Sequence, residues 1–262
     1  EDQINTEEKD TQRRNSGNSK GKLFIVGIGP GPGDKQTNEA AQAISSSSII
    51  VGYETYIELI KDMVHGKKVY SSGMMEEEDR AKFAIEEVLK GNRVALISSG
   101  DPGVYGMAGL VLEIIAAEKK DIDVEIIPGV PSANTAAAIL GAPLMLDYAT
   151  ISLSDLLVPW DVIEKRITSC ASSDMVIALY NPKSKARHTQ LKMACDIILK
   201  YRSPETPIGI VRDAGRNEQK VILSTLGRMS DEEVGMRSII IVGNSTTFRY
   251  KDWIVTPRGY RL

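Results

Sequence analysis

Short apolar runs alternate with longer helical stretches along the first half of this chain. We predict strands at KLFIVGIG, SIIVGY, VALISSG and VEIIPG, because these runs have the length and composition of strands, and KKVYSS is a weaker candidate. Helical periodicity marks the stretches NEAAQAISSS, EEDRAKFAIEEVLKG, MAGLVLEIIAAEKK and SANTAAAILG. Strands that alternate with helices form a mainly parallel sheet covered by helices on both faces. We therefore predict that the first half is an α/β domain.

The alternation breaks at GAPLMLDYATISLSDLLVP, and the second half follows another order. We expect helices at PWDVIEKRITSCASS and HTQLKMACDIILKYRS, and strands at DMVIALYN, PIGIVRD, KVILSTL and SIIIVGN. The last three strands follow one another without helices, so their sheet should be mixed. The fold class is therefore α/β with two domains, residues 22–144 and 145–262, and the active site is expected in the cleft between them. Residues 1–21 are almost wholly polar and are predicted to form a disordered tail.

Composition limits the classes of function open to the chain. Its 262 residues, 42% of them hydrophobic and 26% charged, are typical of a soluble globular protein. The net charge of −3 gives no overall attraction for nucleic acid, and no window approaches the roughly 18 apolar residues of a membrane span. Cys170 and Cys195 lie far apart, which suits a reducing cytoplasm. His65 and His188 are too scattered for a histidine-built metal site, so we expect no metal.

Glycine and proline crowd the ends of two predicted strands. The first strand runs into VGIGPGPGD at 26–34, and the VALIS strand runs into SSGDPGVYG at 98–106. Glycine permits close backbone approach, whereas proline stiffens a turn and removes a donor. Ligands bind at the carboxyl ends of strands in open α/β sheets. We therefore predict a binding site at these loops, with the carboxylate of Asp101 held firmly by the backbone of its stiff turn.

The first glycine-rich loop does not match the common phosphate-binding patterns. A G-x-G-x-x-G fingerprint fails because its sixth position is Pro32 when counted from Gly27, and Asp34 when counted from Gly29. Pro30 and Pro32 also remove two donors that a pyrophosphate would use. A cationic, amphipathic cofactor such as S-adenosylmethionine fits a donor-poor loop. An NAD-dependent oxidoreductase of the Rossmann type is the alternative.

Five stretches resemble, in the same order, the tetrapyrrole (corrin/porphyrin) methyltransferase family. They are VGIGPGPGD, SSGDPGVYGMAG, IIPGVPSANTAAAILGAPL, IALYNPKSK and IVRDAGR, and the resemblance extends over residues 22 to about 245. VGYETYIELI, SSGM and ISLSDLLVPWDVIEKR are similar to the branch that acts at carbon 17 of precorrin-3B or cobalt-factor III. The resemblance implies a homodimeric, cytoplasmic enzyme of cobalamin biosynthesis. It would transfer a methyl group from S-adenosylmethionine to carbon 17 and contract the ring. A noncatalytic relative that only binds S-adenosylmethionine is a further alternative.

The resemblance also implies which residues form the site. Asp101 and Tyr180 are the catalytic candidates, and Asp147 and Asp213 lie in or near the same motifs. The many carboxylates of a tetrapyrrole substrate call for basic residues, for which the candidates are Lys183, Lys185, Arg187 and Arg212. The cofactor would lie against Pro30, Ser99, Gly100, Asp101, Val104, Pro131, Ser132, Tyr180, Asn181 and Ala214.

Two positions depart from the family pattern. Gln36 precedes Thr37, where an apolar residue is usual, and Leu146 stands where relatives often carry a histidine. If that histidine moves protons in the relatives, the departure at Leu146 bears on ring contraction more than on methyl transfer.

Overall fold

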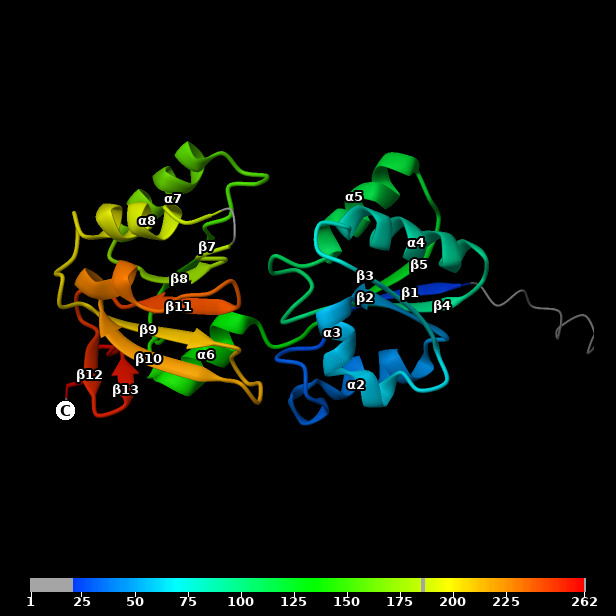
Figure 1. Ribbon diagram of the computed structural model, residues 1–262, viewed down its shortest axis with the longest axis horizontal. Helices are drawn as coiled ribbons and strands as arrows, with labels where there is room; N and C mark the ends of the chain where they lie inside the picture. Colours follow the sequence, from blue (N-terminus) through cyan, green and yellow to red (C-terminus); the bar gives the residue numbers. More distant parts are fainter. Residues whose placement is uncertain (1–20, 185–186, 262) are drawn as a thin grey trace, which may run out of the picture. The chain divides into compact units, whose positions relative to one another are not determined.

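The computed structural model describes residues 21–184 and 187–261, which fold into two compact units (Figure 1). The first unit extends to Gly129 and the second begins at Val130. Except for Gly21, the predicted tail lies outside the described residues. Within the described ranges, no helix has both the length and the apolar composition needed to cross a membrane.

A five-stranded parallel sheet forms the centre of the first unit, in the order β3-β2-β4-β1-β5. All of its strand pairs are parallel, which confirms the parallel sheet that the sequence predicts. In Figure 1, α2 and α3 lie on one face of this sheet and α4 and α5 on the other. The strands are β1 (Lys22–Gly27), β2 (Ile49–Tyr53), β3 (Lys68–Ser72), β4 (Arg93–Ser98) and β5 (Asp123–Ile127). The helices are α2 (Asn38–Ser46), α3 (Glu54–Leu59), α4 (Glu77–Leu89) and α5 (Ala108–Glu118), with short 3-10 turns η1 (Gly33–Lys35) and η2 (Lys61–Met63).

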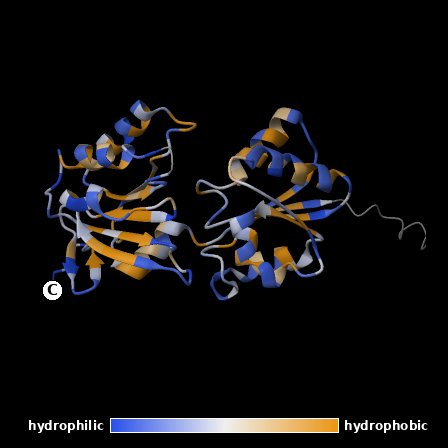
Figure 2. Cartoon of the chain, in the orientation of Figure 1, coloured by the Kyte–Doolittle hydropathy of each residue, from blue (hydrophilic) through white to orange (hydrophobic). Residues whose placement is uncertain are grey.

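Alternate residues of each strand pack on opposite faces of this sheet. Leu23 and Ile25 of β1 join the core beneath α4 and α5, whereas Phe24 and Val26 join the core beneath α2. Because both faces are covered, the inner strands β1, β2 and β4 are nearly continuous apolar runs. Figure 2 shows this as hydrophobic colour along the central strands.

The second unit is built on a mixed sheet in the order β10-β9-β11-β8-β7. Only β7 and β8 pair in parallel, and β11 runs antiparallel to both of its neighbours, which confirms the expected mixed sheet. Its strands are β7 (Tyr148–Ser152), β8 (Val176–Tyr180), β9 (Pro207–Arg212), β10 (Lys220–Thr225) and β11 (Ser238–Val242). A small sheet contains β6 (Gly141–Ala142), β12 (Phe248–Tyr250) and β13 (Trp253–Val255).

Helices cover both faces of the mixed sheet. On one face lie α7 (Trp160–Ser172), α8 (Gln190–Ile198) and the 3-10 helix η3 (Leu226–Asp231), whose apolar residues share one core with the strands. On the other face, α6 (Ser132–Leu140) packs against β9 and β11. Gly209 of β9 makes room for this helix, because a Cβ there would lie 2.4 Å from a methyl carbon of Leu140.

The division at Gly129 lies earlier in the chain than the boundary expected between residues 144 and 145. The difference concerns mainly α6, which belongs to the second unit because its buried side packs on the second sheet. Helical periodicity reports that one side of a helix is buried, but it does not report which sheet buries it.

Each unit contains a buried charged side chain that joins neighbouring segments, Glu87 in the first unit and Arg202 in the second. Glu87 of α4 accepts hydrogen bonds from Lys90 Nζ at 2.8 Å, Asn92 Nδ2 at 3.1 Å and Lys68 Nζ at 3.3 Å. The hydrogen bond from Lys90, with a smaller contribution from Lys68, lowers the pKa of Glu87. In the second unit, Arg202 donates to the backbone carbonyl of Gly243 at 2.5 Å and to that of Met175. Burial lowers the pKa of Arg202, against an opposing effect of Asp174.

Candidate active site

The loops after β1 and β4 are joined at the carboxyl edge of the first sheet. The N–H of Gly29 donates to the carbonyl of Gly100 at 3.0 Å, and the N–H of Gly100 donates to the carbonyl of Gly29 at 2.9 Å. Both residues have left-handed backbone conformations, with φ of 58° and 67°, which glycine adopts without strain. The two predicted glycine-rich loops therefore form one structure.

Backbone packs directly on backbone where β1, β4 and β5 end. A Cβ on Gly27 would lie 2.6 Å from the Gly100 oxygen, and one on Gly129 would lie 2.2 Å from the same oxygen. These distances leave no space for a side chain at either position. The sheet order β4-β1-β5 brings the three strand ends together, and glycine is required for that close approach.

The carboxylate of Asp101 links two of these loops. Its Oδ1 accepts a hydrogen bond from the Gly103 N–H at 2.8 Å, and its Oδ2 accepts one from the Gly129 N–H at 3.1 Å. This confirms the prediction that the backbone holds the carboxylate. It also gives Asp101 a structural role, because the side chain ties the turn after β4 to the loop after β5.

Five glycine N–H groups at this edge are already used by acceptors within the protein. A nucleotide pyrophosphate needs free backbone donors at such a loop. The edge instead offers carbonyl oxygens and the carboxylates of Asp34 and Asp101, and the segments 28–34, 99–107 and 128–132 contain no lysine or arginine. Acceptors without basic side chains fit a cationic group better than a phosphate, which disfavours the NAD alternative. The occupied donors are those of Gly29, Gly31, Gly100, Gly103 and Gly129.

The departure at Gln36 has a structural explanation. Gln36 Nε2 donates to the carbonyl of Gly31 at 2.7 Å, so this polar side chain fastens the glycine-rich loop. The hydroxyl of Thr37 accepts from the Ala40 N–H at 3.1 Å and caps α2, and it donates to the Pro128 carbonyl at 3.4 Å. In the sequence, Gln36 stands out only as a departure from the family pattern. Its polarity beside the loop was the available signal.

In the second unit, Tyr180 lies at the carboxyl end of β8. Its hydroxyl oxygen accepts a hydrogen bond from the Ala133 N–H in the first turn of α6 at 3.0 Å, and its side chain is almost fully buried. The backbone carbonyl of Tyr180 accepts from the Leu153 N–H at 2.9 Å. The structure thus brings the predicted cofactor residues Pro131 and Ser132, which begin α6, next to Tyr180.

Arg187 holds the turn that follows Tyr180. Its Nε donates to the Asn181 carbonyl at 3.0 Å, and its Nη1 donates to Ser154 Oγ at 3.3 Å. Burial lowers the pKa of Arg187, and Asp155 opposes this effect. The predicted substrate residue Arg187 therefore has a structural role, whereas Lys183 is exposed. Lys185 lies outside the described residues.

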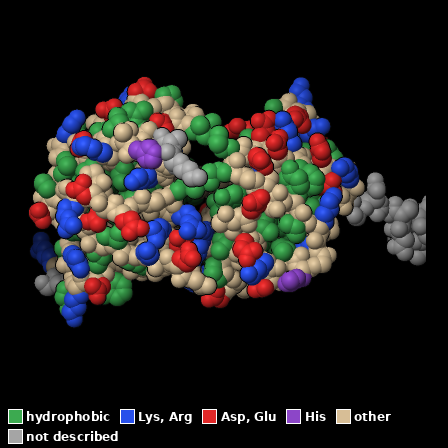
Figure 3. Space-filling model, viewed as in Figure 1, with side chains coloured by type: hydrophobic (Ala, Val, Ile, Leu, Met, Phe, Trp, Pro, Cys, Tyr) green, Lys and Arg blue, Asp and Glu red, His purple; other side chains and the backbone are tan. Residues whose placement is uncertain are grey.

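The carboxyl end of β9 carries a buried carboxylate with arginine partners, next to the predicted cofactor residue Ala214. Asp213 is 3% exposed and has a φ of 50°. Its carboxylate lies 3.0 Å from Arg237 Nε and 3.7 Å from Arg216 Nη1. Neither of its oxygens accepts a hydrogen bond from the described part of the chain, so charge attraction holds it. On the face shown in Figure 3, lysine and arginine side chains are prominent over this unit.

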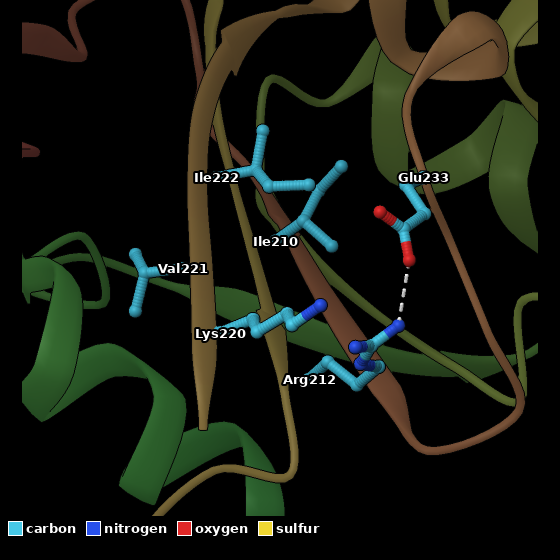
Figure 4. Close-up of a pocket in the computed structure, with 6 residues that line it drawn as sticks. All are labelled: Ile210, Arg212, Lys220, Val221, Ile222 and Glu233. Atoms are coloured by element: carbon cyan, nitrogen blue, oxygen red, sulfur yellow. Dashed lines mark hydrogen bonds and ion pairs between the residues drawn. The ribbon is translucent and has the colours of Figure 1, made fainter. Parts of the chain in front are cut away.

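Arg212 lines a hollow of about 260 Å³ beside β9 and β10 (Figure 4). Its Nη1 is paired with Glu233 Oε1 at 2.8 Å, and Lys220 is its neighbour across the strand pair. The predicted substrate residue Arg212 is therefore already paired with an acid. The walls of the hollow include Ile210, Val221 and Ile222.

The remaining candidates are placed more simply. His65 and His188 are both exposed, and Asp147 directly precedes β7. Within residues 21–184 and 187–261, no group of three or more histidines, cysteines or acids could hold a metal ion. The two groups of predicted cofactor residues lie on different units, and a cleft between the units stays a prediction.

Comparisons with known proteins agree with this arrangement. The family model of the tetrapyrrole (corrin/porphyrin) methylases matches residues 22–230. A probable cobalt-factor III C(17)-methyltransferase of Salmonella typhimurium is 48% identical, over 92% of this chain and 100% of that relative. A cobalt-factor III methyltransferase of Priestia megaterium is also 48% identical over 92% of this chain, which spans only 46% of that longer relative.

A solved structure shows the same fold. The crystal structure of the methyltransferase CobJ matches with a TM-score of 0.86 at 36% identity, and the match covers 90% of this chain and 100% of the CobJ chain. The chain therefore belongs to the tetrapyrrole (corrin/porphyrin) methylase family. The resemblance inferred from its motifs, including the carbon-17 branch, is confirmed.

Proposed function

We propose that this chain transfers a methyl group from S-adenosylmethionine to carbon 17 of cobalt-factor III or precorrin-3B, with ring contraction, in cobalamin biosynthesis. The observation that carries the proposal is the 48% identity to a relative named for carbon-17 methylation, whose whole length the chain spans. The acceptor-rich edge of the first unit is independent support, because it fits a cationic cofactor.

The bound cofactor supplies the methyl group, and the chain has to hold it. Methyl transfer needs a nucleophilic carbon in line with the sulfonium methyl at about 3–3.5 Å, and this geometry accounts for much of the rate. In the first unit the cofactor would meet the edge formed by Pro30, Ser99, Gly100, Asp101 and Val104. In the second unit it would meet Pro131, Ser132, Tyr180, Asn181 and Ala214.

The substrate would be held through its carboxylates, and separate residues would exchange protons with it. The exposed Lys183, together with Lys185 and Arg212, would meet the substrate carboxylates, while Arg187 holds the backbone of the turn after β8 through Asn181. Asp101 and Tyr180 are the candidates for the proton transfers of ring contraction. The family resemblance also supports a cytoplasmic homodimer. If the protein is a homodimer, sedimentation should give the mass of two chains.

The decisive experiment incubates the protein with methyl-labelled S-adenosylmethionine and, in parallel, with cobalt-factor III and precorrin-3B. We expect label in one of the two macrocycles, a mass gain of one methyl group and a changed absorption spectrum. Calorimetry in the same buffer should detect S-adenosylhomocysteine and not NAD. Cofactor binding without labelled product would indicate a noncatalytic relative. NAD binding without S-adenosylhomocysteine binding would contradict the proposal.

A further inference from the structure

The loop between β7 and α7 carries two leucines that face water. Leu156 is 68% exposed and Leu157 is 91% exposed, which is the highest exposure among the large hydrophobic side chains of the described residues. They belong to the stretch ISLSDLLVPWDVIEKR, which is similar to the carbon-17 branch of the family. Adjacent exposed leucines are unfavourable in water and commonly mark a surface that contacts a partner or ligand. We call this pair the leucine tip.

The base of the loop is fixed, so the exposure of the leucine tip does not come from a loose segment. Leu153 is fully buried, and its N–H donates to the Tyr180 carbonyl at 2.9 Å. Asp155 Oδ2 accepts from Gln190 Nε2 at 2.8 Å. After the tip, Val158 and Trp160 pack against the core of the second unit.

The leucine tip is connected to the predicted ligand residues of the same unit. Arg187 donates both to Ser154 in the base of the loop and to the carbonyl of Asn181, and so joins the loop to the turn after β8. The exposed Lys183 lies in that turn. An apolar projection beside a cationic turn matches a ligand that has a flat apolar body and a rim of carboxylates.

We propose that Leu156 and Leu157 pack against the apolar face of the tetrapyrrole substrate, while Lys183 meets one of its peripheral carboxylates. This inference rests on the proposed function, because the macrocycle is the substrate class named there. The leucine tip then contributes to substrate specificity, and does not contact the cofactor or the reacting atoms. A second copy of the chain is the competing occupant of the same surface.

The test compares the variant L156S/L157S with a matched control, L89S/L112S, whose leucines are exposed on α4 and α5. We measure macrocycle affinity by absorption titration, S-adenosylhomocysteine affinity by calorimetry, thermal stability and sedimentation. Losing the apolar contacts of two partly covered leucines should weaken macrocycle binding by about 10-fold or more. Cofactor affinity and Tm should stay unchanged, and the control should bind both ligands normally. The variant L156M/L157M, which keeps the apolar volume, should restore macrocycle binding.

Three results would overturn the inference. The first is unchanged macrocycle affinity in L156S/L157S. The second is loss of self-association with normal macrocycle affinity, which would assign the leucine tip to a second copy. The third is a parallel fall in Tm and in cofactor affinity, which would mean that the leucines only stabilise the fold. Failure of the proposed function is distinguishable, because the unmodified protein itself would then neither bind nor methylate either macrocycle.

Discussion

Replacing Asp101 with asparagine tests whether this carboxylate holds the carboxyl edge of the first sheet together. Asparagine keeps one acceptor oxygen but turns an NH₂ group toward the N–H of either Gly103 or Gly129, which now bond Oδ1 at 2.8 Å and Oδ2 at 3.1 Å. Hydrogen bonds to charged groups contribute about 1.5–3 kcal/mol, and we expect the lower part, roughly 2 kcal/mol, because the side chain is only half-buried. At about 2–4 °C per kcal/mol for a chain of this size, D101N should melt about 4–8 °C lower.

Differential scanning calorimetry and urea unfolding measure this change. The matched control is D34N, which removes the same charge from an exposed aspartate on the neighbouring loop. If D101N and D34N melt together, the structural role of the Asp101 carboxylate is refuted. The contribution of the Asp101 charge to cofactor binding is tested separately in folded D101N. If the carboxylate attracts the cationic sulfonium, D101N should bind S-adenosylmethionine more weakly relative to S-adenosylhomocysteine than the unmodified protein does. An unchanged ratio and normal single-turnover methyl transfer would remove Asp101 from the reaction.

The remaining predictions concern charged side chains elsewhere. The pKa of Glu87 is lowered chiefly by Lys90, so its ion pairs stabilise the fold above the unfolded pKa of about 4.3, and this stability is lost as pH falls through the lower folded value. The stability of E87Q should therefore fall less between neutral and acid pH than that of the unmodified protein. An identical dependence of stability on pH in the two proteins would contradict the stabilising role of the Glu87 ion pairs. Arg202→Met leaves the buried Gly243 carbonyl and the partly buried Met175 carbonyl without this donor, and should cost about 2–4 kcal/mol by urea unfolding. A loss below about 1 kcal/mol would refute the role given to this guanidinium. Arg187→Ala should lower both Tm and macrocycle affinity, whereas Lys183→Ala should lower macrocycle affinity alone. Equal losses of Tm in the two variants would show that both side chains are structural.

Most strands and helices could be located from the sequence, because their burial patterns are local and strong. Two of the exceptions are instructive. The helix Glu54–Leu59 has six residues and no buried side chain, so it leaves little periodicity to detect. The strand Tyr148–Ser152 lies at the edge of its sheet with one partner, and its side chains are mostly only partly buried.

The candidate site was predictable as a set of motifs and not as a set of contacts. The motifs placed Asp101, Tyr180 and the glycine-rich loops at strand ends, and the structure agrees. They also suggested that Arg187 meets the substrate, which stays a prediction, and the structure adds that its guanidinium donates to Asn181 and Ser154. A basic residue that joins two turns and one that binds a carboxylate look the same in a sequence, because the difference lies in side-chain direction.

The α/β class, the two kinds of sheet and the family could all be inferred from the sequence alone. These follow from local periodicity and from motif order, which do not depend on knowing which strands are neighbours. The hydrogen bond between Asp101 and Gly129, 28 residues away, and the close packing of Gly27, Gly100 and Gly129 emerge only in the folded structure. The reason is the strand order β4-β1-β5, which places the ends of strands that are distant in sequence within hydrogen-bonding distance.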